Sequence, residues 1–223
     1  MKVIILSAGR GERLKPLSDH TPKPLLRAGK HRIIEYTIQS LVKAGFTDLV
    51  INTAHLPEQF PAALADGSRY GATISYSPEL QGGLETAGGI INALPLLGDE
   101  PFLVVNGDIW TDYPFEQLRN FKLDKSKLGH LILVNNPEHH PNGDFSLLSG
   151  LVSQQSGEKY TFSGIAIYHP ELFADLKPER LALKPVLLQA IEQQHLSGEH
   201  YQGQWSDIGT IERLEQLVTQ LAH

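Results

Sequence analysis

The sequence predicts an α/β protein whose mixed, mostly parallel sheet is flanked by helices. Short continuous apolar runs, which are typical of strands buried on both faces of a sheet, alternate with stretches in which apolar residues recur at helical spacing. Turns that contain glycine or aspartate follow several of these runs. Because the alternation strand, helix, strand, helix, strand is typical of doubly wound sheets, we expect ligands to bind at the carboxyl ends of the strands.

The predicted elements of the first half begin with a strand at residues 3–6. Apolar residues then recur at helical spacing from Ile33 to Val42, and Gly45 stands where such a helix would end. The remaining elements of this half are a strand at 49–52, a helix at 57–65, a strand at 72–76, a helix at 90–97 and a strand at 101–105.

The second half continues with strands at residues 130–134 and 160–168. An amphipathic helix is predicted at residues 181–193, and Lys184 within it is expected to lie on the surface. The last helix opens at Thr210, and its apolar face is formed by Ile211, Leu214, Leu217, Val218 and Leu221.

Length and composition restrict the class of protein. A chain of 223 residues predicts a single domain, residues 1–223. The absence of cysteine excludes a disulfide framework, a thiolate nucleophile and a cysteine-based zinc site. The net charge of −6 argues against binding of bulk nucleic acid. No apolar run approaches the length of a membrane span and no signal peptide is evident, so we expect a cytoplasmic protein that binds no membrane.

A glycine-rich loop follows the first strand. Gly9 and Gly11 allow main-chain N–H groups to approach a polyanion. Positive charge nearby is supplied by Arg10, Arg13, Lys15 and Lys23. The pattern therefore predicts a triphosphate cradle. It is neither a dinucleotide fingerprint, which would need glycine at position 14, nor a Walker A loop, which would end in Gly-Lys-Ser/Thr.

This stretch resembles the signature of the sugar-phosphate nucleotidyltransferases, Leu-x-Ala-Gly-x-Gly-x-Arg-Leu/Met-x-Pro-Leu followed by Pro-Lys. The matching residues are Leu6, Ala8, Gly9, Gly11, Arg13, Leu14, Pro16, Leu17, Pro22 and Lys23. Ten matches in one stretch disfavour the alternative of a solvated basic turn. The resemblance implies a Rossmann-like fold of the glycosyltransferase-A type, with Arg13 and Lys23 as catalytic residues at the phosphates. It implies a nucleotide site that includes Ala8, Gly9, Gly11, Glu12, Arg13 and Lys23.

A second glycine-rich segment, residues 77–89, leads into a predicted helix. Small residues let a nucleobase slide against the backbone, and the resemblance assigns this loop to the base, with Gly83 among its contacts. Glu85 and Thr86 either face the phosphates or cap the helix, and the sequence favours neither role.

Two aspartates are candidate metal ligands. Asp108 follows the buried strand at 101–105 on a tight turn, where a carboxylate suits a hard divalent cation, although turn-forming aspartates are also common there. Asp207 lies in Trp205-Ser-Asp-Ile-Gly-Thr210, which matches the Trp-x-Asp-x-Gly-Thr motif of the same enzymes. The resemblance implies that both carboxylates hold one Mg²⁺ as catalytic residues.

The resemblance divides the chain into a nucleotide-binding half, about 1–112, and a sugar-binding half, about 113–223. It implies that the sugar 1-phosphate contacts Asn106, Gly143, Asp144, Ser163 and Gly164. Adjacent histidines on a loop usually point apart, so His139 and His140 are expected to be solvated rather than metal ligands. The family commonly carries Glu-Lys-Pro before this strand, but here Glu158-Lys159 is followed by Tyr160. No sugar-phosphate role is therefore assigned to Lys159.

Within the family, Gly11-Glu-Arg13, the run from Asn106 to Asp112 and Phe162-Ser-Gly164 resemble the bacterial N-acetylmuramate α-1-phosphate uridylyltransferases. That resemblance implies a monomer that transfers UMP from UTP to N-acetylmuramic acid α-1-phosphate, releasing pyrophosphate, in peptidoglycan recycling. The same resemblance predicts a basic residue at position 142, to bind the lactyl carboxylate of muramic acid, but this chain has Asn142 there. Two alternatives stay open: another acceptor, such as glucose 1-phosphate with dTTP or mannose 1-phosphate with GTP, and a non-catalytic nucleotide sensor.

Overall fold

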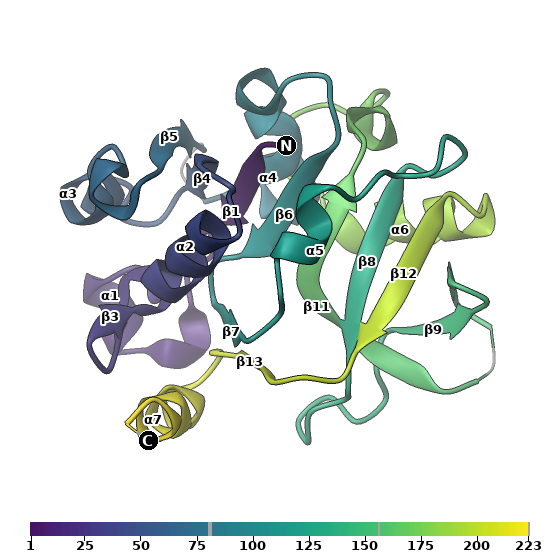
Figure 1. Ribbon diagram of the computed structural model, residues 1–223. Helices are drawn as coiled ribbons and strands as arrows, with labels where there is room; N and C mark the ends of the chain where they lie inside the picture. The colour runs from purple at the N-terminus through teal and green to yellow at the C-terminus, as the bar shows by residue number, and fades with distance from the viewer. Residues whose placement is uncertain (80–81, 156, 223) are drawn as a thin grey trace.

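The computed structural model describes residues 1–79, 82–155 and 157–222. Their centre is a nine-stranded sheet in the order β5-β4-β1-β6-β11-β8-β12-β10-β9 (Figure 1). Its strands are β1 (Val3–Leu6), β4 (Asp48–Thr53), β5 (Thr73–Pro78), β6 (Phe102–Asn106), β8 (Gly129–Val134), β9 (Phe145–Leu148), β10 (Leu151–Ser153), β11 (Lys159–Tyr168) and β12 (Leu196–Tyr201). Two short ribbons pair β2 (Arg27–Ala28) with β3 (His31–Arg32), and β7 (Ile109–Thr111) with β13 (Trp205–Asp207).

Helices cover both faces of the sheet. They are α1 (Leu17–His20), α2 (Ile33–Lys43), α3 (Gln59–Leu64), α4 (Glu85–Leu97), α5 (Glu116–Arg119), α6 (Leu183–Glu192) and α7 (Ile211–Gln220). Short 3-10 turns occur at Glu12–Leu14, Lys23–Leu25, Ser68–Tyr70 and Pro170–Phe173. No helix in the part of the chain that the structure describes has the length and apolar character to cross a membrane.

The predicted α/β class and mixed sheet are confirmed. Parallel pairing joins β5, β4, β1 and β6, and then β11 runs antiparallel between β6 and β8. The strands β9, β10 and β12 and the β7–β13 ribbon were not predicted, because their segments are short or polar. Helix α4 begins at Glu85 rather than residue 90, since Gly88 and Gly89 concealed its first turns. A Cβ on Gly88 would overlap the carbonyl of Glu179, so close packing requires glycine inside this helix.

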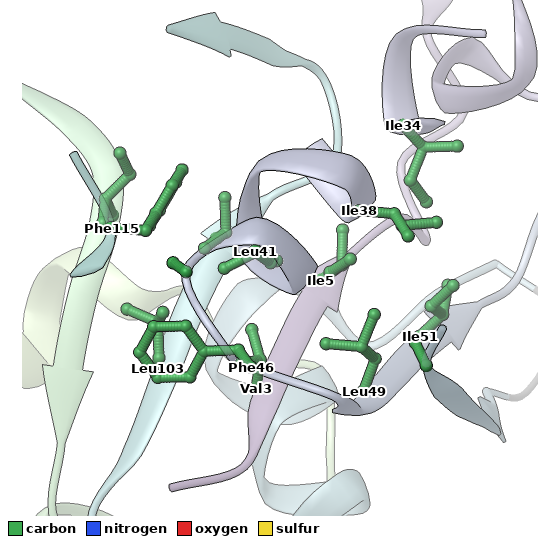
Figure 2. Packing of buried hydrophobic residues seen from close by; sticks show 14 of the residues in the cluster. Val3, Ile5, Ile34, Ile38, Leu41, Phe46, Leu49, Ile51, Leu103 and Phe115 are labelled. Carbon is green, nitrogen blue, oxygen red and sulfur yellow. The ribbon is translucent and has the colours of Figure 1, made fainter. Parts of the chain in front are cut away.

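The core is built outward from β1. Successive strand residues face opposite sides of a sheet, so Val3 and Ile5 lie on one face and Ile4 on the other, and all three are fully buried. Figure 2 shows Val3 and Ile5 packed against side chains of α2, among them Ile38. Ile4 packs on the α4 side, against a cluster that includes Ile90. The continuous apolar run at 3–6 is explained by this double coverage.

A third, smaller cluster fixes the loop after β1. Leu14 is fully buried against Ile208, Leu214 and Leu217, which belong to α7 and the segment before it. Helix α7 in turn lies beside the β2–β3 ribbon (Figure 1). The end of the chain therefore packs directly on the loop that the sequence assigns to the triphosphate.

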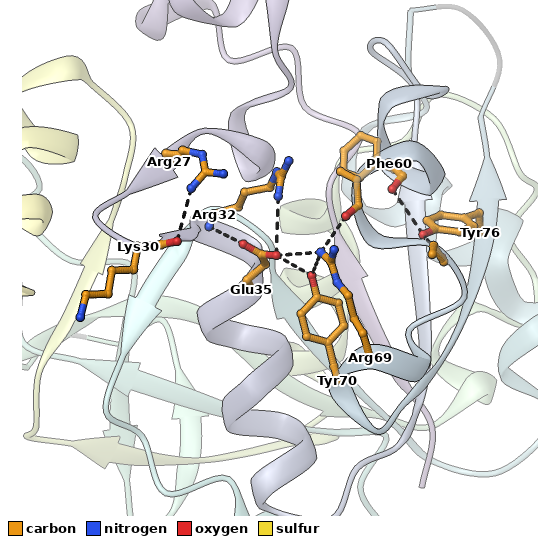
Figure 3. Close-up of polar contacts among 10 residues, drawn as sticks. Arg27, Lys30, Arg32, Glu35, Phe60, Arg69, Tyr70 and Tyr76 are labelled. Atoms are coloured by element: carbon orange, nitrogen blue, oxygen red, sulfur yellow. Dashed lines mark hydrogen bonds and ion pairs between the residues drawn. The ribbon is translucent and has the colours of Figure 1, made fainter.

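A polar network around Glu35 ties α2 to the turn at Ser68–Tyr70 (Figure 3). The carboxylate accepts hydrogen bonds from the Arg32 N–H at 2.7 Å, from Arg69 at 2.9 Å and from the Tyr70 hydroxyl at 2.5 Å. Burial acts to raise the pKa of Glu35, but the hydrogen bonds from the Arg32 N–H and the Tyr70 hydroxyl, together with the charges of Arg32 and Arg69, outweigh it and lower the pKa. The charged carboxylate thus closes the first turn of α2.

A second network joins β8 and β12, and it makes stability depend on pH. The Tyr113 hydroxyl donates to Oε1 of Glu199 at 2.7 Å, and His130 lies 3.6 Å from Oε2. The His130 interaction, followed by the Tyr113 hydrogen bond, lowers the pKa of Glu199. A carboxyl group whose pKa is lowered by folding stabilises the fold above its unfolded pKa, and that stabilisation disappears as pH falls through the folded pKa.

We therefore expect Glu199→Gln to lower the melting temperature at pH 7 by about 3 °C. The difference from wild type should shrink as pH falls below about 4, where the wild-type carboxyl is itself protonated. Thermal denaturation followed by circular dichroism from pH 3 to 8 measures this, with Glu138→Gln as an exposed control. A difference that stayed constant over this range would contradict the assignment.

Candidate active site

A cavity of about 740 Å³ opens at the carboxyl ends of β1, β4 and β6. Leu6 and Asn106, the last residues of β1 and β6, lie in its wall. The remaining lining residues are Ser7, Ala8, Gly9, Arg10, Lys23, Pro24, Asn52, Ala54, His55, Leu56, Pro57, Glu58, Glu79, Gly82, Gly83, Glu85, Thr86 and Asp108. The cavity thus lies at the sheet edge where ligand was predicted.

Lys23 reaches this cavity from a short turn that packs on the glycine loop. Gly11 has a φ of 67°, and a Cβ there would lie 3.2 Å from Cβ of Lys23, so glycine at this position permits both the turn and the close approach. Lys23 is nearly buried, and its Nζ forms an ion pair with Oδ2 of Asp108. A lysine and a carboxylate from distant parts of the chain therefore meet at the predicted reaction centre.

The loop residues predicted to bind nucleotide divide into two groups. Ala8, Gly9, Lys23 and Gly83 line the cavity, whereas Gly11, Glu12 and Arg13 do not. Glu12 is exposed and pairs with Arg10 at 3.0 Å and Lys15 at 2.8 Å. Arg10 lines the cavity instead, and Arg13 lies beside Gly209, where an added Cβ would be 3.0 Å from its Nη2.

A chain of hydrogen bonds joins the phosphate loop to the predicted base loop. The Ser7 N–H donates to Oδ1 of Asn52 at 2.6 Å, Nδ2 of Asn52 donates to Glu79 at 2.6 Å, and the Leu84 N–H donates to Glu79 at 2.7 Å. Burial raises the pKa of Glu79. Sequence reasoning missed Asn52 and Glu79, although Asn52 closes the predicted strand at 49–52. Residues 80 and 81 of the predicted base loop lie outside the described residues.

The start of α4 lies between two cavities. Glu85 and Thr86 line both of them, and no side chain caps the helix. Of the two roles that the sequence left open for these residues, helix capping is not found in the structure, and the ligand-facing role stays a prediction. Glu85 has a φ of 59°, which is strained for a residue with a side chain, and it accepts a hydrogen bond from Arg180 at 2.9 Å.

The two predicted metal ligands are neighbours because β7 and β13 pair. Asp207 is opposite Ile109 in this ribbon, and the Ile208 N–H donates to the Asp108 carbonyl at 2.8 Å. Asp108 lies in the turn directly before β7 and Asp207 is the last residue of β13, so the ribbon brings together two residues that are 99 positions apart in the sequence. Asp108 is paired with Lys23, and Oδ1 of Asp207 lies 2.6 Å from Nη1 of Arg213 and 2.9 Å from Nε2 of His139.

This donor set suits Mg²⁺. The described residues contain no group of three or more histidine, cysteine, aspartate or glutamate side chains that could hold a metal, so a metal at Asp108 and Asp207 would need further ligands from substrate or water. Mg²⁺ in nucleotide enzymes is commonly held by one or two carboxylates, with phosphate oxygens and water completing its octahedron. The residues present therefore fit a metal that is shared with a triphosphate.

A second cavity of about 430 Å³ adjoins the first and shares Asn106 with it. Two further predicted sugar ligands, Asp144 and Gly164, lie in its wall. Gly164 has a φ of 80°, and a Cβ there would overlap the Asn106 amide, so glycine lets Asn106 face the cavity. The other lining residues are Leu6, Glu85, Thr86, Val104, Phe145, Phe162, Ala182, Leu183, Lys184 and Leu187.

The remaining sugar predictions fall outside this wall. The Ser163 hydroxyl is buried, donates to the Ile132 carbonyl at 2.7 Å and accepts from the Ile165 N–H at 3.1 Å, so it stabilises the bulge in β11. Gly143 has a φ of 59° in a turn packed on the Lys159 backbone, and it does not line the cavity. Lys184 is exposed in the first turn of α6, as predicted, and it also lines the cavity.

The two histidines of the loop 135–144 both contact carboxylates rather than being merely solvated. Nε2 of His139 lies 2.9 Å from Asp207, and Nε2 of His140 lies 3.3 Å from Asp144. The loop therefore bridges the candidate metal ligand and the second cavity. Arg213 contacts both Asp207 and His139, and the sequence analysis did not identify it. Its only signal in the sequence is its place in the predicted final helix, three residues after Thr210.

Known proteins resemble this chain over nearly its whole length. A model of the nucleotidyl transferase family matches residues 2–223. An N-acetylmuramate alpha-1-phosphate uridylyltransferase from Neisseria meningitidis serogroup B is 50% identical over 222 residues, which is 97% of this chain and 96% of that protein. A mannose-1-phosphate guanyltransferase from Aspergillus fumigatus is 33% identical over 94% of this chain, but the match spans only 61% of that longer protein.

Solved structures share the fold. The inositol-1-phosphate CTP transferase from T. maritima superposes with a TM-score of 0.79 at 16% identity, over 100% of this chain and 96% of that one. At 16% identity such a likeness shows the architecture alone, whereas the match to the family model over residues 2–223 and the 50% identity to the Neisseria relative show the family. The chain therefore belongs to the nucleotidyl transferase family.

Proposed function

We propose that this protein transfers UMP from UTP to N-acetylmuramic acid α-1-phosphate, giving UDP-N-acetylmuramic acid and pyrophosphate. The observation that carries the proposal is the 50% identity over 97% of the chain to the Neisseria meningitidis uridylyltransferase. Two adjoining cavities that share Asn106 supply a place for a nucleotide beside a place for a sugar phosphate.

The nucleotide occupies the larger cavity in this proposal. Main-chain N–H groups at Ala8 and Gly9 face the triphosphate, and the segment around Gly83 faces the base. The Asn52–Glu79 hydrogen bond holds the phosphate loop and the base loop at a fixed separation. Arg13 approaches the phosphates from the Gly209 side of the cleft.

The reaction is an in-line displacement at the α-phosphorus. A phosphate oxygen of the sugar 1-phosphate forms the new P–O bond, and the bond from the α-phosphorus to the bridging oxygen of pyrophosphate breaks. Because no proton transfer or protein nucleophile is needed, catalysis consists of positioning and charge neutralisation. Lys23 supplies a positive charge at the reacting phosphate, while Asn106 and Asp144 orient the sugar.

Asp108 and Asp207 would hold Mg²⁺, which supplies Lewis-acid neutralisation of the phosphate oxygens when bound. The ion pairs of Asp108 with Lys23 and of Asp207 with Arg213 keep both carboxylates neutralised without it. We further propose that the chain acts as a single-domain monomer, in the cytoplasm, in peptidoglycan recycling.

Pyrophosphate release tests this function. With UTP and Mg²⁺, we expect N-acetylmuramic acid 1-phosphate to give a kcat/KM at least about tenfold above those of N-acetylglucosamine 1-phosphate and glucose 1-phosphate. Mannose 1-phosphate with GTP is included because of the guanyltransferase relatives. Preference for another pair would keep the mechanism and overturn the substrate, whereas release with none of the pairs would support a nucleotide sensor.

A further inference from the structure

Two arginines and a histidine gather near Asp207, where the loop 135–144 meets α7. Nη1 of Arg213 lies 2.6 Å from Oδ1 of Asp207 and 2.6 Å from Nε2 of His139. Nη2 of Arg213 lies against Gly209, next to Nη2 of Arg13. We call Arg13, His139, Asp207 and Arg213 the Arg213 cluster.

The cluster has more positive than negative charge. Its two guanidinium groups converge on Gly209, whereas Asp207 is its single carboxylate, and Asp108 nearby is already paired with Lys23. Within residues 1–79, 82–155 and 157–222, Arg13 forms no ion pair. Two guanidinium groups that lie against the same glycine repel each other, so an anionic group of a ligand between them would stabilise the arrangement.

Arg213 keeps donors for such a ligand. Only 12% of its side chain is exposed, so its guanidinium is held in a fixed orientation. Nη1 makes the contacts with Asp207 and His139, while Nε and Nη2 donate no hydrogen bond to any residue that the structure describes. A guanidinium presents two parallel N–H groups that match the two oxygens of a carboxylate.

The loop 135–144 connects the cluster to the sugar cavity. His139 contacts Asp207, and the next residue, His140, contacts Asp144 in the cavity wall. Within the loop, Asn142 occupies the position at which the resemblance predicts a basic side chain for the carboxylate of the sugar. Arg213 reaches this loop from α7, so the fold brings a cation to it from a different element.

We propose that Arg213, assisted by His139, binds the carboxylate of an acidic sugar 1-phosphate and so selects it over neutral hexosamine phosphates. The inference rests on the proposed function and names the group that would recognise its substrate. The carboxylate lies against Nε and Nη2 of Arg213, and Asp207 retains Nη1. Neutral sugars lack the carboxylate and gain nothing from the interaction.

The test compares kcat/KM for N-acetylmuramic acid 1-phosphate with that for N-acetylglucosamine 1-phosphate, using UTP and Mg²⁺. Arg213→Met is expected to lower the ratio at least about 30-fold, through a higher KM for the acidic sugar. Arg213→Lys keeps the charge but not the paired donors, so its ratio should lie between wild type and Arg213→Met. His139→Gln should lower the ratio less than Arg213→Met does.

Arg69→Met is the matched control, because it removes another arginine that is paired with a carboxylate, Glu35, on a different part of the surface. Its ratio should equal that of wild type. Equal losses on both sugars in Arg213→Met would overturn the inference, because Arg213 would then act on groups that both substrates share. Far-ultraviolet circular dichroism checks folding, and Arg213→Lys decides the matter if Arg213→Met does not fold.

Failure of the inference and failure of the proposed function give different results. A wild-type enzyme that does not use the acidic sugar would overturn the function and the inference with it. An unchanged ratio in Arg213→Met and Arg213→Lys, on an enzyme that prefers the acidic sugar, would overturn the inference alone.

Discussion

Asp108→Asn is expected to lower kcat by about a thousandfold, or on the order of 4 kcal/mol of transition-state stabilisation. The β7–β13 ribbon brings Asp108 close to Asp207, and Asp108 also fixes Lys23 by an ion pair. Asparagine has nearly the same shape but no charge, so it weakens metal binding while it leaves the turn intact. Steady-state pyrophosphate release in saturating Mg²⁺ measures the loss.

Asp112→Asn provides the matched control for this variant. Asp112 lies four residues further along the same motif, where Oδ1 accepts hydrogen bonds from the Tyr201 hydroxyl and the Gln204 N–H. An asparagine oxygen can accept both of them, so activity should stay within about threefold of wild type. If Asp108→Asn retained a rate within tenfold of wild type, Asp108 would be only a turn-forming residue.

Lys23→Met should lower kcat by about a hundredfold and change KM for UTP by less than about fivefold. Lys23 is nearly buried beside Asp108, with its Nζ at the cavity, so its charge is fixed where negative charge develops in the transition state. An interaction that strengthens in the transition state appears in kcat rather than in KM. Initial rates over a range of UTP concentrations separate the two constants.

Lys127→Met is the control for Lys23→Met. Lys127 does not line the cavity, and its Nζ donates a hydrogen bond to the Gln194 carbonyl. Both constants should match wild type. A raised KM for UTP with an unchanged kcat in Lys23→Met would instead make Lys23 a ground-state contact of the triphosphate.

The first half of the fold could be predicted because its signals are local. Each buried parallel strand is a continuous apolar run, and each helix has a regular apolar face, as in α2. The strands β9, β10 and β12 lie toward one end of the sheet, where partial exposure breaks the apolar run. These strands pair with segments that are distant in the sequence, so no short stretch of sequence predicts them.

The site was predicted unevenly for a similar reason. Ala8, Gly9, Lys23 and Asp108 lie in a contiguous motif or directly after a strong strand, and all four line the cavity. Ser163 was placed in the sugar site from its position in a motif, but a β-bulge turns its hydroxyl into the core. The direction of a side chain at a bulge depends on the register of the neighbouring strand.

The sequence by itself determined the fold class, the phosphate loop and the two candidate carboxylates, because glycines, charges and apolar runs in a short motif carry that information locally. Only the tertiary structure decided which cations accompany the carboxylates. Arg213 stands in a helix whose sequence shows only an amphipathic pattern, and Lys184 stands in another. Where these two side chains lie depends on how α7 and α6 pack, and for α7 this is set by the contacts of Leu214 and Leu217 with Leu14.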